Sequence, residues 1–217
     1  MASAWIFGVL VLATACSPAL VRVASAPATP LPAVSAPRFP EGRSERVRSR
    51  SLDMPIELML PDKANWSISD GPSWLEAEHR ASESKFALRT WRADRLVRRS
   101  ECESQARLVR PSIPIAREES TIDARAFAAP AGFDVALLVG VEPSAQGVAG
   151  YAIVFGASVG YCYAAVFTTF AEGAGADGEI ATRLGIAVDR VLSSVRTRSV
   201  DDRAVRHRLV ATPNASK

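Results

Sequence analysis

The sequence has little lysine and histidine, and it has no Cys-x-x-Cys pair of the kind that redox enzymes use. Only three of its 26 basic residues are lysine, and the basic residues are spread among 23 acidic ones, so the net charge is only +3. A nucleic-acid-binding surface would gather basic residues into one stripe that matches the phosphates. The two histidines, His79 and His207, are far apart, and no carboxylate–histidine cluster has the spacing of a metal site. The sequence therefore predicts no nucleic-acid partner, no metal and no cofactor.

Only three cysteines are present, and the first follows an apolar run. Residues 4–15 are uncharged; they are too few to cross a bilayer, which needs about 20 residues, but they suit the apolar core of a secretory signal. The residues LATAC that end at Cys16 resemble the lipobox of bacterial lipoproteins. The resemblance implies a signal peptide over residues 1–15, cleavage before Cys16, and a diacylglyceryl group on its thiol. An ordinary signal peptide cut near Ala15 and an uncleaved anchor are the alternatives.

The segment after Cys16 has the composition of a linker. Residues 17–40 hold six prolines among alanine, serine and threonine, which favours extended chain of about 3.1 Å per residue. An arginine cluster follows at Arg43, Arg46, Arg48 and Arg50. We expect residues 16–51 to be a disordered tether, with these arginines solvated or lying on anionic headgroups. Because Ser17 is not the aspartate of inner-membrane retention signals, the resemblance implies the outer membrane of a Gram-negative cell envelope, with the domain on its periplasmic or surface face.

Residues 52–197 have the alternation of a folded domain. The predicted strands are 55–61, 66–68, 75–79, 85–91, 122–127 and 133–141, with a turn at Asp70-Gly71-Pro72. A short helix is expected to begin at Ser100, where Ser100 and Glu103 match a capping box, and to end at Pro111. Its inner face would carry Cys102, Ala106 and Val109.

The second predicted helix covers residues 179–195. Its apolar stripe consists of Ile180, Leu184, Val188, Val191 and Val195. We expect Arg183 and Asp189 to face outward. The pattern predicts an α+β domain in which two helices cover one side of an antiparallel sheet, followed by a polar C-terminal tail at 198–217.

An uncharged stretch lies between Glu142 and Glu172 and is long enough to span a membrane. It has no leucine between 143 and 171 but is rich in glycine and in the strand formers tyrosine, valine, phenylalanine and threonine. We therefore predict two neighbouring strands, 151–155 and 161–170, joined by the turn 156–160. An integral membrane protein with a span at 148–170 is the alternative.

The predicted turn Gly156-Ala157-Ser158-Val159-Gly160 matches G-x-S-x-G and so resembles the nucleophile elbow of serine hydrolases. That elbow needs a strand, a sharp turn and then a helix. Asp189 or Asp202 and then His207 follow Ser158 in the chain order of such a triad. However, only 59 residues follow Ser158, and the next residues have the pattern of a strand. A hydrolase with Ser158 as nucleophile is therefore the alternative function.

The other two cysteines are Cys102 and Cys162. Once Cys16 is assigned to the lipid, these two cysteines remain. A pair of cysteines in an exported protein suggests a disulfide, which would tie the short helix to the hairpin. Closing a loop of about 60 residues would stabilise the fold by roughly 4 kcal/mol. Two buried reduced thiols are the alternative.

Several aromatic and charged side chains are candidates for binding. Trp66, Trp74 and Trp91 suit either a glycan-stacking platform or the core of a small β-rich domain. His79, at a strand end, is expected on the surface or rim. A solvated rim, or a contact with an acidic partner or phospholipid, is expected for Arg89, Arg92, Arg95, Arg98 and Arg99.

Four short motifs carry a wider resemblance: Trp91, Ser100-Glu101-Cys102, Gly160-Tyr161-Cys162 and Arg183-Leu184. With them in place, residues 52–197 resemble uncharacterised bacterial lipoproteins of myxobacterial type, and the order of elements resembles the PsbP/Mog1-like α/β sandwich. The resemblance implies a non-catalytic binding or assembly accessory domain. Such a domain would be held at the membrane by its N-terminal lipid and would have an envelope protein or a glycan as partner.

Overall fold

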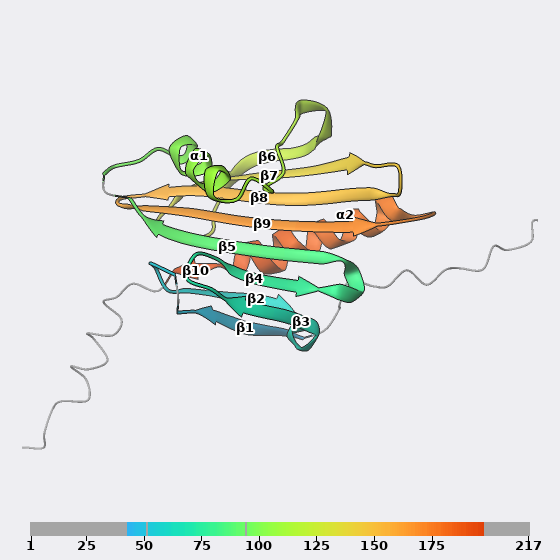
Figure 1. The fold of residues 1–217 in the computed structure, drawn as a ribbon, viewed down its shortest axis with the longest axis horizontal. Coiled ribbons are helices and arrows are strands. Elements are labelled where there is room, and N and C mark those ends of the chain that lie inside the picture. The colour runs from blue at the N-terminus through green and yellow to red at the C-terminus, as the bar shows by residue number, and fades with distance from the viewer. Residues whose placement is uncertain (1–42, 51, 94, 198–217) are drawn as a thin grey trace, which may run out of the picture. The chain divides into compact units, whose positions relative to one another are not determined.

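A computed structural model describes residues 43–50, 52–93 and 95–197 (Figure 1). The predicted signal peptide, Cys16, most of the tether and the C-terminal tail lie outside these residues. The described part is a mixed α+β fold with two antiparallel sheets and two α-helices, in which strands predominate.

The larger sheet has seven strands, and every neighbouring pair is antiparallel. In spatial order they are β3 (Trp66–Asp70), β4 (Leu75–His79), β5 (Ser84–Arg92), β9 (Tyr161–Ala171), β8 (Val148–Ser158), β7 (Asp134–Pro143) and β6 (Thr121–Phe127). Each of these strands overlaps a strand predicted from the sequence, by alternation for β3 to β7 and by strand-forming composition for β8 and β9.

The smaller sheet has three strands in the order β1 (Ser44–Ser49), β2 (Ile56–Pro61) and β10 (Arg196–Thr197). Strand β1 lies in the segment expected to be a disordered tether, so that expectation was wrong for residues 44–49. Val47 and Ser49 are buried, and the Ser49 hydroxyl donates to Asp70 Oδ1 at 2.5 Å. The intervening arginines face solvent, which hid the strand among basic residues.

The uncharged stretch forms the hairpin of β8 and β9, two strands of eleven residues each. They are joined by Val159 and Gly160 alone, and Gly160 has φ 73°, a conformation that favours glycine. The turn is therefore shorter than predicted, since Gly156 and Ser158 belong to β8. A helical span at 148–170 is wrong, because these residues are strands and a turn. In the described part of the chain, no helix has the length and apolarity to cross a membrane.

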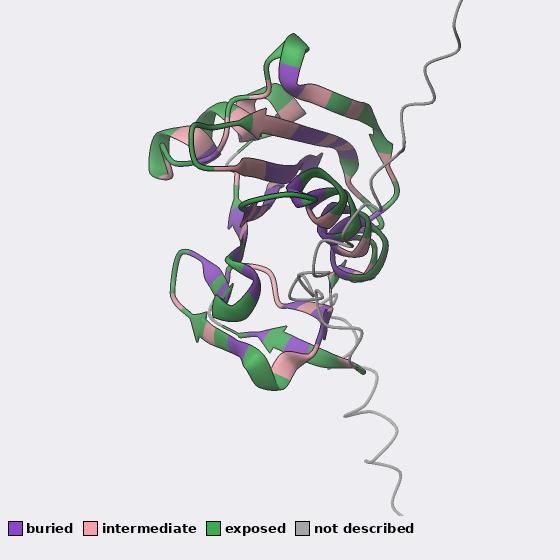
Figure 2. Ribbon diagram, turned by 90° about the vertical axis from the view of Figure 1, so that its right-hand side faces the viewer, coloured by how far each residue is buried: buried purple, intermediate pink, exposed green. Residues whose placement is uncertain are grey.

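The two helices pack on opposite faces of the larger sheet. α1 (Arg99–Val109) shares a core with Tyr151, Ile153 and Phe155 of β8 and with Cys162, Ala164 and Val166 of β9. α2 (Ala176–Ile186) and its continuation through η4 (Ala187–Val191) and η5 (Leu192–Ser194) share the other core with Ala152, Val154 and odd-numbered residues of β9. The expectation that both helices cover one side was wrong. Both faces of β8 and β9 are apolar, and each helix contacts these two strands. Buried residues therefore gather in the middle of the fold and exposed ones at its outer edges and turns (Figure 2).

Two details of α1 differ from prediction. The helix begins at Arg99 with Arg98 as N-cap, because the Arg98 carbonyl accepts the first helical hydrogen bonds from the amides of Glu101 and Cys102. Ser100 therefore lies inside the first turn, and the capping box is not formed. Cys102 and Ala106 are buried as predicted, whereas Val109 is 53% exposed.

The second helix begins three residues earlier than predicted. All five residues of its predicted apolar stripe are buried, and Asp189 is exposed as expected. Arg183 contradicts the prediction, since only 2% of it is exposed.

Candidate functional site

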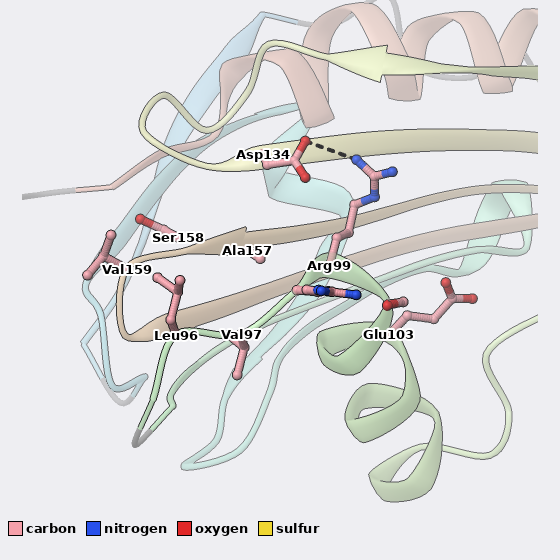
Figure 3. A pocket seen from close by; sticks show the side chains of 10 residues that line it. Leu96, Val97, Arg99, Glu103, Asp134, Ala157, Ser158 and Val159 are labelled. Atoms are coloured by element: carbon pink, nitrogen blue, oxygen red, sulfur yellow. Dashed lines mark hydrogen bonds and ion pairs between the residues drawn. The ribbon is translucent and has the colours of Figure 1, made fainter.

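One end of the larger sheet carries a hollow of about 620 Å³ (Figure 3). Its walls come from three segments that are distant in sequence: the connection from β5 to α1 together with the start of α1, Asp134 at the start of β7, and the end of β8 with the β8–β9 turn. The amide of Ala93 donates to the Gly160 carbonyl at 2.9 Å, which holds the β5–α1 connection against the hairpin turn. We call this end of the sheet the tip; it consists of Arg92, Ala93, Arg95–Ser100, Glu103, Asp134 and Ala157–Gly160.

Two exposed aliphatic side chains line the hollow at the tip. Leu96 is 78% exposed and Val159 is 79% exposed, and both line the hollow (Figure 3). Four arginines belong to the tip. Arg98 and Arg99 line the same hollow, and Arg92 and Arg95 line a second one that shares Val97 with it. Apolar side chains bordered by cationic ones form a surface suited to a partner that is partly apolar and partly acidic.

Two of these arginines already have carboxylate partners. Arg99 pairs with Asp134 at 3.0 Å, and Arg95 pairs with Glu101 at 3.5 Å. Arg92 and Arg98 are exposed and have no ion pair among residues 43–50, 52–93 and 95–197. The tip therefore has two exposed cationic groups without a carboxylate partner among these residues, as expected for a solvated rim.

Ser158 lines the hollow at the end of β8, but the elbow geometry is not formed. The chain continues from Ser158 through the turn directly into β9, where a nucleophile elbow has a helix. Within the described residues the only histidine is His79, which lies at the opposite end of the sheet from Ser158. His79 pairs with Ser84 at the start of β5. Ser158 pairs with Tyr161, which itself pairs with Arg92 at the end of β5. Asp189 lies in η4 rather than at the hollow, and Asp202 and His207 lie outside the described residues. The geometry argues against catalysis by Ser158.

The predicted pairing of Cys102 with Cys162 is present in the structure. Their Cα atoms are 5.4 Å apart and a disulfide joins them, which ties α1 to β9. Both residues are fully buried in the core between α1 and the sheet. The crosslink thereby fixes the first turn of α1, and with it Arg98 and Arg99, relative to the hairpin.

A buried chain of polar side chains occupies the end of the sheet opposite the tip. His79 Nδ1 lies 2.7 Å from Ser82 Oγ, Ser82 Oγ lies 2.9 Å from Ser84 Oγ, and Ser84 Oγ lies 2.9 Å from Thr169 Oγ1. Arg183 Nη1 donates to Thr169 Oγ1 at 3.1 Å and to the Phe170 carbonyl at 2.6 Å. The chain links η2 (Arg80–Ser82), β5, β9 and α2.

The two charged or titratable members of this chain were placed on the surface by sequence, and both placements were wrong. His79 is 4% exposed, and its Nε2 lies 3.6 Å from Asp62 Oδ2. Arg183 forms an ion pair with Glu179. Burial lowers the pKa of the Arg183 guanidinium, and the carboxylates of Glu179 and Glu83 oppose that shift. Because Ser82 is only 1% exposed, this series of hydrogen-bonded side chains contributes to packing rather than forming an accessible reaction centre.

The tryptophans belong to the cores. Trp66, Trp74 and Trp91 are each 9% exposed or less, so the glycan platform is wrong and the alternative, a core position, is correct. The Arg89 guanidinium carbon lies 5.1 Å from the Trp91 ring centroid and 6.0 Å from that of Trp74. Burial lowers the pKa of Arg89, an effect that Asp53 opposes.

The arginine cluster near the N-terminus is partly neutralised. Arg46 and Arg48 flank Glu57, with N–O distances of 2.8 and 3.1 Å. In β1 these side chains therefore bridge to β2 as well as facing solvent. Among the described side chains, no group of three or more His, Cys, Asp or Glu residues is placed to hold a metal ion.

Sequence reasoning missed the residues that define the tip. Leu96, Val159 and Asp134 come from separate segments, and nothing in their local pattern shows that they meet. The arginines were found, but not the aliphatic pair at the same end of the sheet.

No protein-family model matches the chain, and no curated protein matches it. Among solved structures, it is similar to a crystal structure from Bacteroides thetaiotaomicron VPI-5482, with a TM-score of 0.40 and 9% sequence identity. The match covers 67% of this chain and 46% of that chain, so this chain spans less than half the length of that relative. The function of this chain has to be inferred from its own residues.

Proposed function

We propose that the protein is a lipid-anchored component of a bacterial cell envelope that presents a non-catalytic binding domain. The N-terminal sequence supports export and lipidation at Cys16, with the outer membrane as the expected location. The disulfide supports an oxidising compartment. The proposal includes a PsbP/Mog1-like arrangement of the sheet and helices and an accessory role, in keeping with the sequence resemblance.

The observation that carries the binding role is the exposed pair Leu96 and Val159 among arginines at the tip. Strand β1 begins at the other end of the domain. Its first residue, Ser44, pairs with Pro61, and the Pro61 carbonyl accepts a hydrogen bond from the Trp66 indole. Trp66 in turn pairs with His79, which lies at the end of the sheet opposite to the tip. The chain therefore enters the described domain at the end opposite to the tip. A tether attached there leaves the tip free to meet an envelope partner with an acidic, partly apolar surface.

The anchor is tested by intact mass spectrometry of protein extracted from membranes. The expected mass is that of a chain beginning at Cys16 with added acyl chains, and a Cys16→Ser variant should lose them. A native chain that begins elsewhere and carries no acyl mass would refute the anchor.

The binding role is tested by placing a photo-crosslinking residue at Val159 in the full chain. We expect a discrete adduct that Arg98→Glu weakens, whereas the same probe at Leu108, which is 82% exposed on α1, should give none. Equal adducts at both positions would contradict a specific tip. A fluorophosphonate probe should leave the wild-type chain unlabelled; labelling that Ser158→Ala abolishes would instead establish the hydrolase.

A further inference from the structure

Strand β6 ends the larger sheet with an open edge. It pairs with β7 on one side, and among the described residues no strand lies on its other side. The edge residues Ala124, Arg125 and Ala126 are all exposed. The other terminal strand, β3, differs, because side chains and backbone of the β1–β2 region contact it: Asp70 accepts hydrogen bonds from Ser49 and Arg50, and Trp66 donates to Pro61. An uncovered edge is a template for pairing with another strand.

The charges along β6 are arranged symmetrically about Ala124. Asp123 precedes it and Arg125 follows it. In an antiparallel pair related by a twofold axis through Ala124, residues i and j face each other when their numbers sum to 248, so Asp123 faces Arg125 of the second copy and Arg125 faces its Asp123. Axes through Asp123 or Arg125 would instead place like charges directly opposite, which is unfavourable. The edge is thus complementary to itself in one register.

The surroundings of the edge are partly apolar, beside the charged residues Glu103, Arg107 and Glu118. Ile122 is 63% exposed, and Ile115, which is 68% exposed, lines a hollow of about 600 Å³ together with Ala116, Ala124 and Leu138. A β-bulge lies between Thr121 and Asp123, so the regular part of the edge begins at Asp123 and includes the residues on both sides of Ala124.

We propose that β6 pairs with β6 of a second copy of this chain, antiparallel and centred on Ala124, so that two larger sheets join into one. Asp123 and Arg125, which lie 3.0 Å apart within one chain, then form a ring of four alternating charges with their counterparts. The partner is a second copy because only a strand with the reversed charge order satisfies both positions, and β6 itself supplies that order. This interface uses none of the tip residues, and it stands whether or not the tip binds a partner.

Cysteine crosslinking in the full chain tests the register. An Ala124→Cys variant places two thiols opposite each other at the axis, with Cα atoms about 4.5–5.5 Å apart, within reach of a disulfide. An Ala126→Cys variant is the matched control, since its two thiols would be about 13 Å apart along the strands. Under mild oxidation, non-reducing electrophoresis should show a covalent dimer for Ala124→Cys and monomer for Ala126→Cys.

Charge reversal in the Ala124→Cys background then tests the complementarity. Arg125→Asp faces Asp123 with a second acid and should lower the dimer fraction about tenfold or more. The double change Asp123→Arg with Arg125→Asp restores opposite charges and should restore the dimer. Mixing Arg125→Asp with Asp123→Arg should give heterodimers. The first variant has two acids at these positions and the second has two bases, so each strand is complementary to the other.

Three results would overturn the proposal. They are equal crosslinking at positions 124 and 126, no effect of Arg125→Asp, or an Ala124→Cys chain crosslinked to a different protein in place of itself. Both variant positions are exposed, and circular dichroism together with an unreactive Cys102–Cys162 pair will show that each variant is folded.

Discussion

The two faces of the larger sheet are stabilised in different ways. Among the described residues, the face under α2 joins the smaller sheet in a core of 27 buried hydrophobic residues, whereas the face under α1 has 14, so the second core is about half the size of the first. The smaller core contains the disulfide and the larger contains the buried polar chain that ends in Arg183. A small apolar core is supplemented by a covalent crosslink, and a large one tolerates a buried ion pair.

Among the changes that test this comparison, removal of the disulfide should have the largest effect on stability. Replacing Cys102 and Cys162 by alanine should lower the free energy of unfolding by about 4 kcal/mol, because the closed loop has a sequence separation of 60. Denaturant unfolding measures the loss. Hydrogen exchange should increase in α1 more than in α2, and equal increases in both helices would contradict the proposed division between the two faces.

The same crosslink can be checked without mutation. Thiol alkylation of the unfolded protein should leave Cys102 and Cys162 unmodified until a reductant is added. Ready labelling of both residues without reductant would show that the native protein carries free thiols.

Removing one partner of the buried ion pair should have the next largest effect. Arg183→Leu leaves Glu179, whose side chain is 13% exposed, without its partner, and should cost about 3 kcal/mol of stability. Adding Glu179→Leu should recover most of that loss, because no uncompensated charge is then buried. Arg190→Leu, at an exposed position of η4, is the matched control and should change stability little. A similar loss in both single variants would mean that burial of Arg183 is not the cause.

The close approach of α2 to β8 gives a third prediction. A Cβ on Gly150 would lie 2.6 Å from Ile180 Cγ2, so Gly150→Ala must displace the Ile180 side chain or α2 itself and should cost about 2 kcal/mol. Gly185→Ala is the control on the exposed side of α2, where a Cβ meets nothing within 4 Å, and should stabilise by about 0.5–1 kcal/mol. Thermal unfolding of the two variants should show shifts of opposite sign, and shifts of the same sign would contradict the packing.

The smallest effect is expected at Tyr163 in the larger core. Its hydroxyl is buried and has no hydrogen-bond partner among the described residues, so Tyr163→Phe should stabilise by about 1 kcal/mol. Burial also raises the pKa of Tyr163. Above pH of about 10 the unfolded tyrosine loses its proton while the folded one keeps it, so stability falls as pH rises. The variant should lose that part of the alkaline slope, and destabilisation at neutral pH would contradict this account.

Strand alternation predicted most of the fold, and its failures have physical causes. β2 to β7 and both α-helices were predicted because their apolar spacing is regular, and β8 and β9 because their stretch is uncharged and rich in strand-forming residues. β1 was missed because its exposed positions are arginine or glutamate and one of its buried positions is a serine, Ser49. The sequence does indicate that the helices lie on opposite faces of the sheet. Residues 151–155 are apolar at both odd and even positions, so both faces of that strand have to be covered.

The charged members of the core could also have been placed from spacing. His79 follows Leu75 and Ala77 at alternate positions of one strand, and all three are buried. Arg183 lies three residues after Ile180 and four before Ala187, both of which are fully buried. Both residues were predicted to be exposed because histidine and arginine are polar, although their positions in the strand and the helix indicate burial. The tip could not be predicted, because it depends on loops that meet only through the pairing of β5 with β9.

The pairing of β2 with β10 also sets an order of assembly. β2 joins residues 56 and 57 to residues 197 and 196, nearly the whole length of the domain, whereas β7, β8 and β9 follow one another and pair with their neighbours. Contacts between close residues form fastest, so this meander and the β1–β2 hairpin are expected to fold early and the pairing of β2 with β10 late. A chain made from its amino terminus holds β2 without its last neighbour until residue 197 has emerged, and the N-terminal hairpin closes onto the rest of the domain as a final step.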